Sequence, residues 1–86
     1  MKQIQPVSIW YNGQVVQATI FNLTSINDNL IDSATFYWEL YNATNTQLSQ
    51  GNLTMGSADY TNYSSSPDSN SYAYEWGATQ LNLTLV

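Results

Sequence analysis

The alternation of apolar and polar residues is clearest over residues 33–41. In an extended strand, successive side chains point to opposite faces, so residues two apart share a face. One face of this segment carries Ala34, Phe36, Trp38 and Leu40. We therefore predict a half-buried strand over 33–41, with Phe36, Trp38 and Leu40 in the core.

A β-hairpin is predicted near the start of the chain. Asn12 and Gly13 separate two stretches rich in β-branched and aromatic residues. Asn-Gly is the typical pair of a type I′ turn, which needs positive φ at both central residues. We predict strands over 6–11 and 14–24, followed by a turn at 25–29.

A second hairpin follows from the pattern after the central strand. Residues 42–46 form a short polar segment of the length expected for a hairpin loop. Residues 47–55 then predict the returning strand. Gly51 inside it indicates a bulge or a close approach by another backbone.

The C-terminal third has a different pattern. Residues 56–71 are rich in Ser, Thr, Asn and Asp and predict an irregular loop. The spacing of aromatic and small residues over 72–80 predicts a short helix that brings Trp76 to the core. Its start can be capped by Asp68, Ser69 or Asn70. Residues 81–86 alternate Leu with polar residues and fit either a strand or an extended tail.

These elements predict one small domain over residues 1–86. The fold class is mainly β: two hairpins form an antiparallel sheet, or a small sandwich, with one short C-terminal helix. A chain of 86 residues has little core, and with no cysteine or histidine it has no disulfide and no thiolate- or imidazole-bound metal. We therefore expect stabilisation by self-association or by docking on a larger partner.

The charge balance excludes several partners. One lysine and no arginine face six carboxylates, for a net charge of −5. Nucleic-acid affinity rests on Lys and Arg at the phosphates, so no nucleic-acid partner is expected, and no anionic membrane. No stretch approaches the roughly 20 apolar residues of a membrane-spanning helix. The N-terminal residues lack the apolar core of a signal peptide, which predicts synthesis in the cytoplasm.

The residue types needed for most catalysis are missing. There is no His or Cys for proton transfer or nucleophilic attack, and the carboxylates are scattered along the chain. Residues 27–29 with Asp32 offer oxygen atoms to calcium, but the glycine and terminal glutamate of an EF-hand loop are absent. We expect a structural turn there, no cofactor, no metal site and no enzymatic activity.

Tyrosines gather in and beside the predicted C-terminal loop, where Ser, Asn and Gly surround them. This is the composition of binding loops, in which tyrosine supplies contact area at low entropic cost. One interpretation makes Tyr60, Tyr63 and Tyr74 a partner contact. In the other, Tyr72 and Trp76 anchor the helix on the sheet and the remaining tyrosines cover its edge.

The order of segments over residues 33–86 carries a resemblance. It consists of a strand, a turn, a Gly-x-Leu-Thr strand, Asp-Tyr and a short helix with Trp. In this chain the segments read ATFYWELY at 34–41, QGNLT at 50–54, DY at 59–60, YAYEW at 72–76 and QLNLT at 80–84. This order resembles small structural proteins of tailed-bacteriophage virions. The resemblance implies a capsid- or tail-associated subunit, present in many copies in the virion and contacting other virion or shell proteins.

Two functions follow as hypotheses. The first is a structural or interaction subunit of a larger particle or homo-oligomer, in line with a surface dominated by the 36 Asn, Ser, Thr and Gln residues. Strand edges in 14–24 and 46–55 carry no Lys or Pro and are the expected contacts. The alternative is a small carbohydrate- or protein-binding adhesive module that uses Tyr60 and Tyr63.

Overall fold

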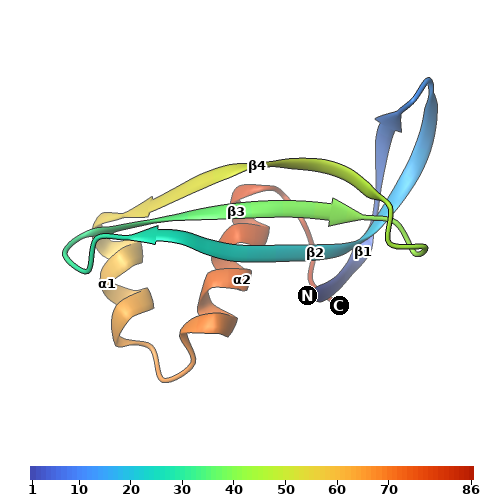
Figure 1. Cartoon of the computed structure of the whole chain (residues 1–86). Coiled ribbons are helices and arrows are strands. Elements are labelled where there is room, and N and C mark those ends of the chain that lie inside the picture. The colour runs from blue at the N-terminus through green and yellow to red at the C-terminus, as the bar shows by residue number, and fades with distance from the viewer.

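The computed structural model describes residues 1–86 and contains a single four-stranded antiparallel sheet with two helices (Figure 1). The strand order in the sheet is β1-β2-β3-β4, so each strand pairs with its neighbour in sequence. The elements are β1 (Lys2–Tyr11), β2 (Gln14–Asp28), β3 (Ser33–Tyr41), β4 (Gln47–Gly56), α1 (Ser57–Ser65) and α2 (Ser69–Gln80). The mainly β fold is confirmed.

The sheet is a continuous meander rather than two separate hairpins. β2 and β3 pair in register through a third hairpin, which joins the two that the sequence predicts. Both helices lie under one face of the sheet, and no second sheet covers the other face (Figure 1). The molecule is elongated, with principal extents of 42 × 22 × 18 Å.

The first hairpin has the predicted turn. Asn12 and Gly13 have φ values of 51° and 80°, the positive pair that a type I′ turn requires. The register between β1 and β2 shifts between Gln3 and Val7. A bulge bends a strand and increases its local twist. In Figure 1 the hairpin accordingly projects away from the rest of the sheet.

The prediction that residues 14–24 form a sheet edge is wrong for most of that segment. β2 lies between β1 and β3, and β1 covers it from Gln14 to Phe21. β1 begins at Lys2, opposite Phe21, so the rest of β2 has no neighbour on that side. The free half carries its own register shift in the pairing with β3, between Ser25 and Asn27.

The C-terminal third holds two helices where the sequence predicts a loop and one helix. The Asp68 side chain caps α2 by accepting a hydrogen bond from the Ser71 backbone N–H, at 3.1 Å. α1 replaces the loop predicted over 56–71. Its Ser and Thr residues have low helix propensity, but Tyr60 and Tyr63, three apart, share a face that packs on the sheet. Tertiary packing therefore outweighs the local preference.

The core lies between the sheet and the helices in two clusters. The first is centred on Phe21, Leu40 and Tyr74 and the second on Phe36 and Met55. Phe36 and Leu40 are buried, as the alternation predicts. Trp38 and Trp76 are half-buried and pack against the clusters from the side.

Gly51 lies under the indole ring of Trp38, its partner on β3. The sequence predicts a bulge at Gly51 or a close approach by another backbone, but the group closest to Gly51 is the Trp38 side chain. The only register shift in this pair of strands is elsewhere, between Leu40 and Tyr41. An aromatic ring over a glycine in an edge strand shields backbone that would otherwise meet water.

We expect Gly51→Ala to lower the free energy of unfolding by about 1–3 kcal/mol, the usual cost of overpacking. A Cβ atom at this position would lie 2.7 Å from Trp38 Cζ2, so the indole must shift. Urea denaturation measures the loss. Gly56→Ala is the matched control, since its Cβ would meet its nearest neighbour at 3.7 Å. Equal midpoints for the two variants would show that Trp38 does not occupy this place.

Candidate interaction surfaces

The carboxylates of the chain do not gather into a group that could hold a metal ion. No three His, Cys, Asp or Glu side chains come together in the structure. Glu39, on the face of the sheet without helices, accepts hydrogen bonds from Asn22 Nδ2 at 3.1 Å and from the Tyr41 hydroxyl at 2.6 Å. The hydrogen bond from Asn22 joins β2 to β3, whereas the one from Tyr41 lies within β3 and raises the pKa of that tyrosine.

The turn between β2 and β3 uses its oxygen atoms internally. Asn29 Oδ1 accepts the backbone N–H groups of Ile31, Asp32 and Ser33 at 2.8–3.1 Å. Asp28 Oδ1 accepts that of Leu30 at 2.8 Å. Side chains of Asn and Asp commonly stabilise turns in this way. The geometry is therefore that of a structural turn.

This turn displays two large apolar side chains to solvent. Leu30 and Ile31 are 82% and 80% exposed. Leu30 also has a positive φ of 61°, which the Asp28 and Asn29 hydrogen bonds hold in place. The polar residues of this segment predict a turn, whereas the sequence signal for an exposed apolar site is the Leu30-Ile31 pair between Asn29 and Asp32.

Tyr60 belongs to the core rather than to a contact surface. It is 5% exposed, and its hydroxyl donates to Asp28 Oδ1 at 2.6 Å. This hydrogen bond and burial together raise the pKa of Tyr60 to about 12. The contact joins α1 to the end of β2, so it fixes the turn that carries Leu30.

Tyr63 and Tyr74 also hold the helices on the sheet. The Tyr63 ring packs edge-on against Phe36, with ring centroids 5.6 Å apart. Tyr74 is buried, and its hydroxyl accepts the Leu23 backbone N–H at 3.1 Å. The prediction of a tyrosine contact surface is therefore wrong for Tyr60 and Tyr74. In the other interpretation, Tyr72 and Trp76 anchor the helix, and both do pack against the second core cluster. Tyr60 and Tyr74 lie in the core rather than over the edge of the sheet.

The most exposed aromatic residue lies on the projecting hairpin. Trp10 and Val15 are cross-strand partners beside the Asn12-Gly13 turn and are 73% and 61% exposed. The next strand pair, Ile9 and Val16, turns to the opposite face and packs toward the core. Sequence alternation alone does not say which face of this hairpin is solvent-exposed.

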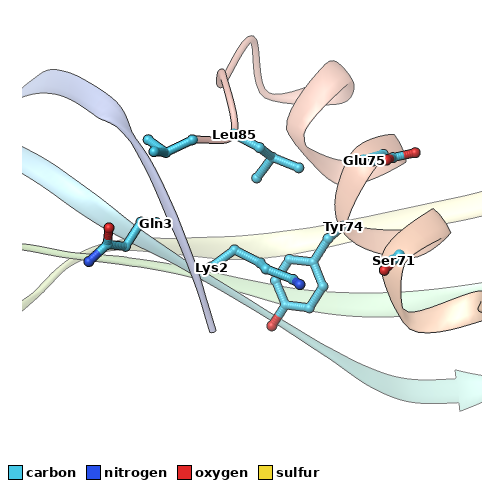
Figure 2. Close-up of a pocket in the computed structure, with 7 residues that line it drawn as sticks. Lys2, Gln3, Ser71, Tyr74, Glu75 and Leu85 are labelled. Atoms are coloured by element: carbon cyan, nitrogen blue, oxygen red, sulfur yellow. The ribbon is translucent and has the colours of Figure 1, made fainter.

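One small pocket opens between β1, α2 and the C-terminal segment (Figure 2). Its volume is about 240 Å³, and the Lys2 ammonium lies 5.8 Å from the centre of the Tyr74 ring. The lining residues are Lys2, Gln3, Ser71, Tyr74, Glu75, Leu85 and Val86.

Comparison with protein-family models, curated proteins and solved structures finds no match for this chain. Neither helix has the length and apolar character needed to cross a bilayer.

Proposed function

We propose that this chain is a non-catalytic interaction subunit of a larger assembly, and more specifically a capsid- or tail-associated component of a phage virion. The observation that carries the proposal is the placement of exposed apolar side chains. Trp10 and Val15 lie at the hairpin tip, while Leu30 and Ile31 lie at the other end of the elongated molecule (Figure 1).

Exposed apolar groups at two ends of a polar protein are typical of contact sites. The hairpin is also free of charge, because residues 3–27 contain no Asp, Glu, Lys or Arg. Its burial in an interface would therefore require no desolvation of an ion. Sites at both ends allow each copy to contact two neighbours, which suits a repeated subunit.

The phage assignment draws on the resemblance over residues 33–86 and on the scarcity of charged residues. The adhesive-module alternative placed its binding site at Tyr60 and Tyr63. Since both residues pack against the sheet, no observation favours that alternative.

The proposal is tested with tagged chain in the cells that produce it. We expect wild-type protein to co-sediment with large particles and Trp10→Ser/Val15→Thr to reduce the bound fraction about tenfold or more, from the lost apolar burial. The control is Ser8→Thr/Gln17→Thr, the exposed pair further along the same strands. Thermal unfolding should be similar for all three proteins. Wild-type protein found only in the slowly sedimenting fraction would contradict the proposal.

A further inference from the structure

The outer edge of β1 is protected against pairing with another strand over residues 3–6. The Gln5 backbone N–H donates to the Thr84 carbonyl at 2.8 Å, and the Val86 N–H donates to the Gln3 carbonyl at 3.1 Å. Pro6 follows directly and has no N–H to offer. A covering segment and a proline are both common means of blocking a sheet edge.

The free half of β2 is protected by different means. Beyond the end of β1, the first free backbone N–H of β2 is that of Leu23, and it donates a hydrogen bond to the Tyr74 hydroxyl. The register shift between Ser25 and Asn27 then interrupts the regular strand at Ile26. A bulge twists an edge away from a partner.

The outer edge of β4 has no such protection. Residues 42–58 contain no charged residue and no proline. None of the hydrogen bonds outside the helices and the strand ladders involves the backbone of residues 47–55. The strand is in regular register with β3 from Ser49 to Gly56. Eight residues of neutral, regular edge strand are therefore free to pair.

We propose that β4 pairs antiparallel with β4 of a second copy of this chain, centred near Asn52, to form one eight-stranded sheet. The pairing rests on the proposed function and deepens it, because it names a second copy as one of the neighbours. In a symmetric antiparallel pair, residues opposite each other point to the same face. All four helices then lie on one side of the joined sheet.

The side chains of β4 fit this register. With Asn52 opposite its own copy, Leu53 of each chain lies opposite Gly51 of the other. Gly51 has no side chain, and the half-buried Trp38 ring covers it. Leu53 can therefore pack against the Trp38 indole of the partner, which extends the apolar core across the joint.

The faces of the sheet favour the antiparallel direction. Parallel pairing of the same two outer edges would need a two-fold axis along the strands, which would turn the helices of the two copies to opposite faces of the joined sheet. Antiparallel pairing keeps the helices of both copies on one face. It also places each Asp59, in the first turn of α1, near residues 42–49 of the other chain, which carry no charge.

The association is tested by sedimentation equilibrium over micromolar to millimolar concentrations. We expect wild-type protein to approach about twice its 9.7 kDa monomer mass. Asn52→Lys should weaken the dimer about fivefold or more, because like charges then lie directly opposite each other. Thr24→Lys is the matched control: Thr24 and Asn52 are both exposed and flank Tyr37 in one row of the sheet. It should leave the dimer unchanged.

Spin labels give a second readout that does not depend on the lysine variants. The chain has no cysteine, so Asn52→Cys and Gln47→Cys each give a single labelling site. Labels at 52 should lie close enough to couple strongly. Labels at 47 should be about 30 Å apart, since ten residues of strand separate them. Short distances at both sites would indicate parallel pairing and overturn the proposal.

The remaining outcomes are equally decisive. A wild-type chain that stays monomeric throughout, or a dimer broken by Thr24→Lys and not by Asn52→Lys, overturns the β4 pairing. A monomer that still co-sediments with particles leaves the proposed function intact. A β4 dimer that never enters a larger assembly contradicts the proposed function alone.

Discussion

Phe21→Ala is expected to lower the free energy of unfolding by about 3–5 kcal/mol, the usual range for truncating a buried aromatic residue. Phe21 is fully buried, packs edge-on against Tyr74 with ring centroids 5.4 Å apart, and reaches toward Gly77 of α2. It joins the middle of the sheet to the helix that covers it. A domain of this size has only about 5–15 kcal/mol of total stability, so the variant should be unfolded in part at moderate temperature.

Urea denaturation of Phe21→Ala and Trp10→Ala measures the effect. Both substitutions remove an aromatic ring from the first hairpin. Because Trp10 is largely exposed, Trp10→Ala should lower the free energy of unfolding by under about 0.5 kcal/mol. The comparison thus isolates burial from aromatic character and strand propensity. Similar midpoints for the two variants would contradict the burial of Phe21, and a lower midpoint for Trp10→Ala would mean that the hairpin faces are reversed.

Local signals predict the hairpin turn and the central strand well. The type I′ turn at Asn12-Gly13 follows from the ability of these two residues to adopt positive φ, which is a local property of the backbone. The face of β3 that carries Phe36 and Leu40 follows from strict alternation. In both cases the determining interaction lies within a few residues, where a sequence pattern can show it.

The helix α1 could not be predicted in the same way. Its residues have weak helix propensity, and its N-cap, Gly56, offers no side-chain hydrogen bond. The helix is held instead by Tyr60 on Asp28, 32 residues away in sequence, and by Tyr63 on Phe36. Such contacts exist only once the sheet has formed, so no window of sequence reveals them.

The candidate surfaces show the same limit. The loop-like composition of the C-terminal third predicts a contact surface at its tyrosines, but Tyr60 and Tyr74 are buried. Trp10, for which the composition predicts no contact, is exposed. The exposed face of the hairpin depends on the irregular register between Gln3 and Val7. Ile4 and Phe21 on one side of this irregularity, and Ile9 and Val16 on the other, all pack toward the core, so the alternation changes phase in both strands. The tertiary bend, rather than the local alternation, therefore decides which aromatic residue meets solvent.

Tyr60 is expected to ionise well above the ordinary pKa of tyrosine, and its titration should weaken the fold at alkaline pH. Its pKa is raised to about 12 from the ordinary value of 10.0, first by the hydrogen bond to Asp28 and then by burial. Between these values the unfolded chain releases a proton that the folded chain retains. The stabilisation is therefore complete below pH 10 and is lost as the pH rises toward 12.

Ultraviolet absorbance of tyrosinate, followed together with urea denaturation across this pH range, tests the assignment. Tyr60→Phe should abolish the transition near pH 12 and flatten the alkaline loss of stability, although it also removes the contact that ties α1 to the β2–β3 turn. Tyr41→Phe is the control, because the Tyr41 hydroxyl likewise donates to a carboxylate but lies on the face of the sheet without helices. Loss of the transition near pH 12 in Tyr41→Phe, with its retention in Tyr60→Phe, would show that the Tyr60–Asp28 hydrogen bond does not form. The same result would leave the exposed Leu30 and Ile31 without the anchor that holds their turn in place.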